Sequence, residues 1–140
     1  MLSIKNLSVN YGSISALRDE NIEVRSGELV TLIGGNGAGK TSTLMAISNL
    51  VPKSGGTIMF KGKDITNLAP DKIVKMGLAH IPEGRRIFPA LTVYENLVTG
   101  TMGNPSIKNK DIPLLIEEQY ALFPRLKERE KQAGGSLSGG

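Results

Sequence analysis

The sequence has no cysteine, no tryptophan and a single histidine. The lack of cysteine excludes disulfides and thiolate metal sites, and one histidine excludes a metal site built on paired histidines. Rings that could stack on bases are scarce, since there are only three tyrosines and three phenylalanines. The 17 basic residues are scattered among 13 acidic ones, so the net charge of +4 does not indicate a nucleic-acid partner.

The sequence also lacks a long apolar run. Residues 1–12 alternate polar and apolar side chains, unlike the continuous apolar core of a signal peptide. The longest apolar stretch, around Leu29–Ile33, is far shorter than the roughly 20 residues of a membrane-spanning helix. We therefore expect a cytoplasmic protein that reaches a membrane only through a partner.

Alternating apolar residues predict a strand over residues 2–11, and a change of phase at Lys5 and Asn6 indicates a bulge. The Gly12–Ser13 pair predicts a turn after this strand. Apolar and β-branched residues predict four further strands, at residues 14–24, Glu28–Ile33, Thr57–Phe60 and Leu78–Ile81. Of these, Glu28–Ile33 is expected to be buried.

Apolar residues at helical spacing predict helices at Lys40–Val51, Pro70–Met76, Thr92–Leu97 and Ile112–Leu122, the last interrupted by Pro124. Thr92 and Glu95 have the spacing of a capping box. The pattern predicts an α/β portion over residues 1–83 and a mostly helical portion over residues 84–140.

The glycine-rich run Gly34–Thr41 reads GGNGAGKT and satisfies the pattern Gly-x4-Gly-Lys-Ser/Thr. Its glycines allow consecutive backbone N–H groups to form an anion nest, and the following helix directs its positive end at the phosphates. Lys40 would contact the β and γ phosphates, and the Thr41 hydroxyl would bind Mg²⁺. An incidental glycine-rich turn would not explain the position between a predicted strand and a predicted helix, so we expect a site for ATP and Mg²⁺.

The longer string Gly35–Ser42, GNGAGKTS, resembles the Walker A loop of ATP-binding-cassette (ABC) ATPases. Tyr11 lies 23 residues before Gly34, where that family places a ring that stacks on adenine. Ala79–Glu83 falls at the position of the family's Q-loop, and Leu137–Gly140, LSGG, matches the start of its signature motif. The resemblance implies a P-loop NTPase fold with an antiparallel β segment, a parallel-sheet core, the start of a helical subdomain and an incomplete sheet.

The resemblance also assigns roles to residues. Lys40 and Glu83 are the implied catalytic residues, and Thr41 and Glu83 are the implied Mg²⁺ ligands. Ser138 would cap a helix that clasps the γ-phosphate held by a second ABC ATPase subunit. The implied nucleotide-binding residues are Tyr11, Gly35, Asn36, Gly37, Ala38, Gly39, Lys40, Thr41, Ser42, Ser138, Gly139 and Gly140.

Glu83 departs from most of the family, which has glutamine there. Glutamate can still ligate Mg²⁺, but it cannot donate a hydrogen bond when ionised. The segment Ile81–Leu97 resembles the ATPases of branched-chain amino acid importers, where glutamate is usual, whereas urea-type importers keep glutamine. The alternatives are an ABC ATPase for urea, amides or other amino acids, a non-transport ABC protein, and a silent nucleotide-binding module.

An importer of this type implies three partners: a second ABC ATPase subunit, an integral membrane permease that contacts Glu83–Leu97, and indirectly an external substrate-binding protein. The protein would then lie on the inner face of the cell membrane. The sequence shows no Walker B strand ending in Asp-Glu. We expect the chain to be a longer protein truncated at the signature motif. We therefore expect the chain alone to bind ATP but not to hydrolyse it.

Overall fold

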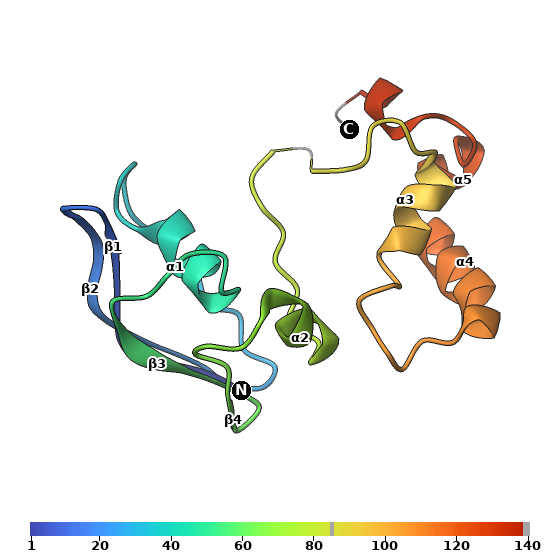
Figure 1. Ribbon diagram of the computed structural model, residues 1–140. Coiled ribbons are helices and arrows are strands. Elements are labelled where there is room, and N and C mark those ends of the chain that lie inside the picture. The colour runs from blue at the N-terminus through green and yellow to red at the C-terminus, as the bar shows by residue number, and fades with distance from the viewer. Residues whose placement is uncertain (85, 139–140) are drawn as a thin grey trace. The chain divides into compact units, whose positions relative to one another are not determined.

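The computed structural model describes residues 1–84 and 86–138 and divides the chain into two compact units. The first unit comprises residues 1–74 and 78–80, and the second comprises residues 75–77 and 81–140 (Figure 1). The strands are β1 (Leu2–Tyr11), β2 (Ile14–Val24), β3 (Gly55–Phe60) and β4 (Lys63–Asp64). The helices are α1 (Lys40–Ile47), α2 (Pro70–Lys75), α3 (Val93–Thr99), α4 (Ile112–Leu122) and α5 (Pro124–Glu128), with 3₁₀ turns η1 (Asn109–Asp111) and η2 (Gly134–Ser136).

The four strands form one antiparallel sheet in the order β2-β1-β3-β4. The register of β1 shifts between Ile4 and Leu7 against β2, and between Lys5 and Ser8 against β3. Asn6 lies at this point with a φ of 51°. The predicted bulge is therefore confirmed, and it lets apolar residues on both sides of the phase change face the core.

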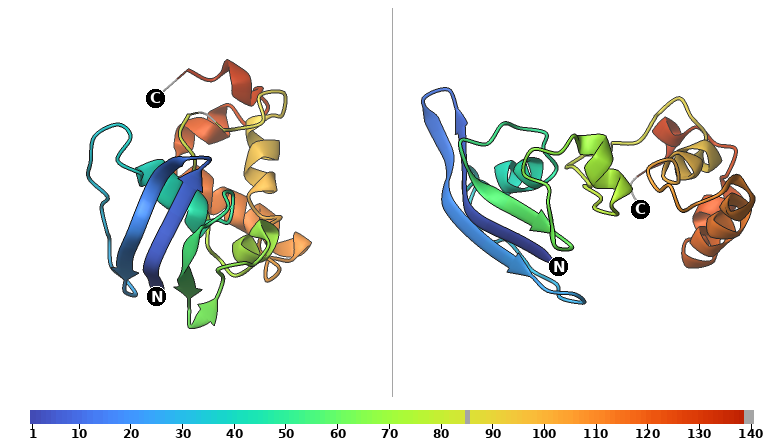
Figure 2. Two further views of the ribbon diagram at one scale, coloured as in Figure 1. Left: turned by 60° about the vertical axis from the view of Figure 1, so that its left-hand side comes forward. Right: turned by 60° about the horizontal axis from the view of Figure 1, so that its bottom comes forward.

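The core of the first unit is built from the sheet, α1 and α2, and α1 lies on one side of the sheet (Figure 2). Burial of each large apolar side chain contributes about 1.5–3 kcal/mol to folding. The buried apolar residues are Ile4, Leu7, Val9, Leu17, Ala46, Ile47, Ile58, Phe60, Ile65 and Ile73. This core holds the first turn of α1, and hence the glycine-rich loop, against β2.

Helix α1 ends at Ile47, earlier than the predicted Val51. Asn49 has a φ of 53°, a left-handed conformation that does not continue a right-handed helix. Its side-chain amide donates hydrogen bonds to the carbonyl oxygens of Ile65 and Leu68, at 2.7 and 2.6 Å. These bonds tie the C-terminal end of α1 to the loop after β4.

Two of the predicted strands are wrong. Neither Glu28–Ile33 nor Leu78–Ile81 pairs with any described strand. Leu29 and Ile33 are 94% and 92% exposed, and Ile81 is 90% exposed. Apolar composition favours a strand, but the backbone needs a neighbour for its N–H and C=O groups. The described residues supply no such neighbour, so the predicted parallel-sheet core is absent from them. The sheet is incomplete, as predicted.

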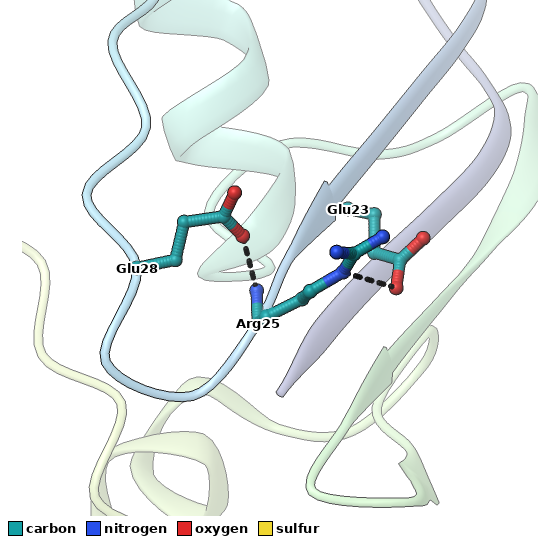
Figure 3. Close-up of polar contacts among 3 residues, drawn as sticks. All are labelled: Glu23, Arg25 and Glu28. Atoms are coloured by element: carbon teal, nitrogen blue, oxygen red, sulfur yellow. Dashed lines mark hydrogen bonds and ion pairs between the residues drawn. The ribbon is translucent and has the colours of Figure 1, made fainter.

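Local polar contacts define the turn that leads into Glu28–Ile33 (Figure 3). The Glu28 carboxylate accepts a hydrogen bond from the Arg25 N–H at 2.7 Å, and the Glu28 N–H donates to the Arg25 carbonyl at 3.3 Å. The Arg25 Nε lies 3.7 Å from a carboxylate oxygen of Glu23, and both side chains are exposed. Such exposed pairs contribute at most about 1 kcal/mol, so they shape the turn without holding the segment beyond it.

The second unit is helical. The predicted capping box at the start of α3 is confirmed: the Thr92 Oγ1 accepts from the Glu95 N–H, and the Glu95 carboxylate accepts from the Thr92 N–H at 2.7 Å. Val93, Ile116 and Tyr120 are buried between α3 and α4. Within the described part of the chain, no helix has both the length and the apolarity needed to cross a bilayer.

Candidate nucleotide-binding site

The glycine-rich loop passes into α1 through Gly39, which has a φ of 85° and a ψ of −4°. A Cβ at this position would lie 2.5 Å from the Leu17 Cδ2 and 2.9 Å from the Ala16 carbonyl oxygen. Gly39 is therefore required both by its left-handed conformation and by the close approach of β2. Ala16 and Leu17 thus support the loop, a role that the sequence did not reveal because it depends on the packing of β2 against α1.

The first turn of α1 offers unpaired donors. Its first intrahelical hydrogen bond runs from the Thr43 N–H to the Gly39 carbonyl at 2.8 Å. Among the described residues, the N–H groups of Lys40, Thr41 and Ser42 consequently have no backbone acceptor. Three unpaired N–H groups at the positive end of a helix suit a phosphate group.

The Lys40 ammonium is held over the loop. Its Nζ donates hydrogen bonds to the carbonyl oxygens of Gly34 and Gly35, at 2.6 and 2.7 Å. An ammonium group has three donors, so one remains for another acceptor. The loop thus gathers a full positive charge and the helix N-terminus in one place, which is the donor set that a polyphosphate requires.

Tyr11 lies beside the same helix. Its hydroxyl is 3.5 Å from the Ser42 Oγ, within hydrogen-bonding distance, and its side chain is 43% exposed. The ring therefore stands at the end of β1 with a surface open to a ligand. The structure brings together Tyr11 and the run from Gly35 to Ser42, which the sequence placed in one site.

The other predicted site residues belong to the second unit. Glu83 is exposed, and its carbonyl oxygen accepts a hydrogen bond from the Arg86 Nε at 3.3 Å. Ser138 is exposed and follows the η2 turn, while Gly139 and Gly140 lie outside the described residues. Residues 1–84 and 86–138 contain no cluster of three acidic or histidine side chains that could hold a metal ion on their own. A Mg²⁺ ion on Thr41 would therefore take most of its oxygen ligands from phosphates and water.

Comparison with known proteins assigns this geometry to a family. The family model described as "ABC transporter" matches residues 17–140. The high-affinity branched-chain amino acid transport ATP-binding protein BraG of Pseudomonas aeruginosa is 43% identical over the whole chain, which covers 59% of BraG. The lipopolysaccharide export system ATP-binding protein LptB of Escherichia coli K12 is 37% identical over 99% of the chain and 57% of LptB.

Solved structures agree with the family match. The structure of an ATP-binding subunit of an ABC transporter superposes with a TM-score of 0.85 at 29% identity, over 99% of this chain and 56% of that one. The chain thus spans less than two thirds of the length of these relatives. With a family model matched over residues 17–140 and a relative 43% identical over the whole chain, this chain belongs to the ABC transporter family.

Proposed function

We propose that the chain is the nucleotide-binding part of the ATPase subunit of an ABC importer that takes up branched-chain amino acids through a membrane permease. The observation that carries this proposal is the 43% identity to BraG, which extends over all 140 residues. Glu83 supports it from the sequence, because the resemblance noted for Ile81–Leu97 is to importers that carry glutamate at this position.

The proposed site binds Mg-ATP through groups of the first unit. Lys40 and the N–H groups that begin α1 contact the β and γ phosphates, and the Tyr11 ring stacks on adenine, a contact worth about 1–3 kcal/mol. Thr41 is the proposed Mg²⁺ ligand in this unit, and the family resemblance implies the same role for Glu83. The ion would neutralise charge that develops on the transferred phosphoryl group.

We further propose that the chain by itself binds ATP without hydrolysing it. Phosphoryl transfer requires water, metal and charge to be positioned together, and among the described residues no three acidic or histidine side chains lie close enough together to hold a metal ion. A second ABC ATPase subunit would complete the site, with Ser138, Gly139 and Gly140 on the γ-phosphate of its nucleotide. Steady ATP turnover by the purified chain that survives Lys40→Ala would contradict this part of the proposal.

The proposed permease contact is the surface of residues 83–97. Ile87, Phe88 and Tyr94 are 42%, 57% and 43% exposed, so this segment presents apolar side chains to solvent. A group of exposed apolar side chains is typical of an interaction surface. Through the permease the ATPase would lie on the cytoplasmic face of the membrane and couple indirectly to an external substrate-binding protein.

Uptake in cells tests the transported solute. In a strain that lacks the gene for this ATPase, uptake of radiolabelled leucine, isoleucine and valine should fall and should return with the native gene but not with Lys40→Ala. Uptake of urea and amides is measured in parallel and should be unchanged. Loss of urea or amide uptake with normal leucine uptake would contradict the proposed substrate.

A second candidate function is export of lipopolysaccharide, because LptB of Escherichia coli shares 37% identity with the chain. The same strain distinguishes the two functions. An export function predicts less lipopolysaccharide at the cell surface with normal leucine uptake, and the proposed importer predicts the opposite.

A further inference from the structure

The side chain of Asn96, in the second turn of α3, binds the loop that precedes this helix. Its Nδ2 donates to the carbonyl oxygens of Phe88, Leu91 and Thr92, at 3.0, 3.1 and 2.9 Å. Its Oδ1 accepts from the Phe88 N–H at 2.9 Å. One amide side chain therefore uses both ends to fix the loop of residues 88–92, and no aliphatic or carboxylate side chain could replace both functions.

The same loop is bound by two glycines that lie far along the chain. The Gly134 N–H donates to the Leu91 carbonyl at 2.8 Å, and the Gly135 N–H donates to the Pro89 carbonyl at 3.0 Å. A Cβ at Gly134 would lie 3.0 Å from the Asn96 Nδ2, and a Cβ at Gly135 would lie 2.8 Å from the Pro89 Cβ. A side chain at Gly135 would therefore force Pro89 to shift, and one at Gly134 would press on the Asn96 amide.

The first turn of α3 completes this contact. The Val93 N–H donates to the Gln132 carbonyl at 2.9 Å, and the Tyr94 N–H donates to the Glu130 carbonyl at 3.0 Å. These are N–H groups that a helix leaves unpaired in its first turn. We define the α3 joint as the contact between residues 87–96 and residues 130–135.

The α3 joint adjoins the signature segment. The Leu137 N–H donates to the Gly134 carbonyl at 3.2 Å, and Ser138 follows directly. Leu137 also lines a hollow of about 300 Å³ together with Ile87, Phe88 and Asn96. The α3 joint therefore connects two parts of the second unit: the exposed apolar surface of residues 87–94 and the start of the signature motif at Leu137.

We propose that Asn96 is a positioning residue. Through the α3 joint, it makes the position of Leu137 and Ser138 depend on whether the surface at residues 87–94 is free or bound to a partner. This inference rests on the proposed function, in which that surface contacts the permease and Ser138 contacts the γ-phosphate of a second subunit. The Asn96 amide bonds to the loop itself, at Phe88, Leu91 and Thr92. It holds the loop against Gly134 and Gly135, so a displacement of the loop displaces the signature segment.

Amide hydrogen exchange on the purified chain tests the joint without reference to transport. Asn96→Ala should increase the exchange rates of the Gly134 and Gly135 amides by about tenfold or more, because their acceptors on Leu91 and Pro89 are no longer held. Asn104→Ala is the matched control: the Asn104 Oδ1 accepts a local bond from the Ser106 N–H, at 3.0 Å, in the loop after α3. Unchanged exchange at both glycines in Asn96→Ala would overturn the proposal.

ATP hydrolysis by the ATPase isolated with its permease tests the positioning role. Asn96→Ala should lower kcat by about 10–100-fold, the usual cost of a misplaced catalytic group, while the affinity for ATP stays within about twofold. Gly134→Ala should act alike, since its added Cβ meets the Asn96 Nδ2. In Asn96→Ala with Gly134→Ala the closest contact of the added Cβ is removed, while the Ile87 Cδ1 at 3.2 Å and the Leu91 carbonyl oxygen at 3.4 Å remain, so the double variant should lose less than the product of the two single losses.

The outcomes separate the inference from the proposed function. A normal kcat in Asn96→Ala, or a double variant whose loss is the product of the two single losses, would overturn the positioning role. If the complete, unmodified ATPase subunit shows no ATPase activity with any permease, the proposed function fails instead, and the exchange rates at Gly134 and Gly135 still decide whether the joint depends on Asn96.

Discussion

Strand β1 and the segment Glu28–Ile33 are both rich in apolar residues but have opposite environments. β1 pairs with β2 on one side and β3 on the other, and its residues Ile4, Leu7 and Val9 are at most 1% exposed. In Glu28–Ile33 no described strand lies alongside, and Leu29 is 94% exposed. The comparison teaches that apolar, β-branched composition supplies only the potential for a strand, which is realised where a neighbour accepts its hydrogen bonds.

The glycine-rich loop begins at the end of the unpaired segment, yet it is held from the other side. Gly39 packs on Leu17 and Ala16 of β2, and Lys40 bonds to the Gly34 and Gly35 carbonyls. The loop therefore depends on β2 and α1 rather than on a paired strand before it. From this we expect the phosphate-binding groups to work in the chain as it stands.

The largest effect is expected from breaking the pairing of β1 with β3. Gly56 has a φ of 92°, and a Cβ there would lie 2.5 Å from the Asn6 carbonyl oxygen and 2.6 Å from the Leu7 Cα. Backbone strain and overpacking each cost about 1–3 kcal/mol, so Gly56→Ala should lower the free energy of unfolding by about 2–6 kcal/mol in urea titrations followed by circular dichroism. The matched control is Gly62→Ala, which has a φ of 75° but open space around it and should cost only about 1–2 kcal/mol.

Truncation of one leucine in each segment sharpens the comparison directly. Leu7 is fully buried, so Leu7→Ala should lower the free energy of unfolding by about 2–5 kcal/mol through lost burial and the cavity left behind. Leu29→Ala should change it by less than about 0.5 kcal/mol, because that side chain is already in water. A loss of several kcal/mol in Leu29→Ala would show that the segment is paired and buried in solution.

The N-terminus of α3 offers a third case, an element stabilised by its own residues. Thr92→Ala removes the acceptor for the Glu95 N–H and should lower stability by about 1 kcal/mol, as is usual for a lost N-cap. Thr92→Ser keeps the hydroxyl and should be nearly neutral. Equal losses in the two variants, measured by urea unfolding, would mean that the hydroxyl does not cap the helix.

The smallest effect is a pH dependence of the same cap. Hydrogen bonds from the Thr92 backbone N–H and then from its hydroxyl lower the pKa of Glu95 below its ordinary value. A lowered pKa in the folded chain means that the ionised form stabilises the cap above the ordinary pKa, and that this contribution is lost as the pH falls through the folded value. A carboxyl titration followed by NMR should show the pKa of Glu95 rising part of the way toward normal in Thr92→Ala, because the hydroxyl bond is lost while the backbone N–H bond remains, and an unchanged pKa would contradict the hydroxyl bond.

The sequence predicted best those features whose signals are local. The capping box of α3, the Gly12–Ser13 turn, the bulge at Asn6 and the start of α1 after Gly39 depend on residues within a few positions of one another. The glycine-rich loop was equally clear, because its glycines and lysine are adjacent. Family resemblance then placed Tyr11 in the same site, and the structure brings it beside Ser42.

The features that could not be predicted depend on distant partners. Glu28–Ile33 was expected to be buried because its composition is that of a strand, and the sequence does not say which segment would pair with it. The contacts of Asn96 with Gly134 arise from packing in the second unit, and nothing in the local pattern of either residue indicates them. The early end of α1 likewise depends on bonds from Asn49 to Ile65 and Leu68.

The central claim is that the loop from Gly34 to Thr41 binds Mg-ATP through Lys40 and the start of α1. Calorimetric titration of Mg-ATP into the chain and into Lys40→Ala tests it most directly. We expect a dissociation constant between about 1 μM and 1 mM, equivalent to about −8 to −4 kcal/mol, with binding lost in the variant. Equal binding by both chains, or no binding by a chain that circular dichroism shows to be folded, would contradict the account.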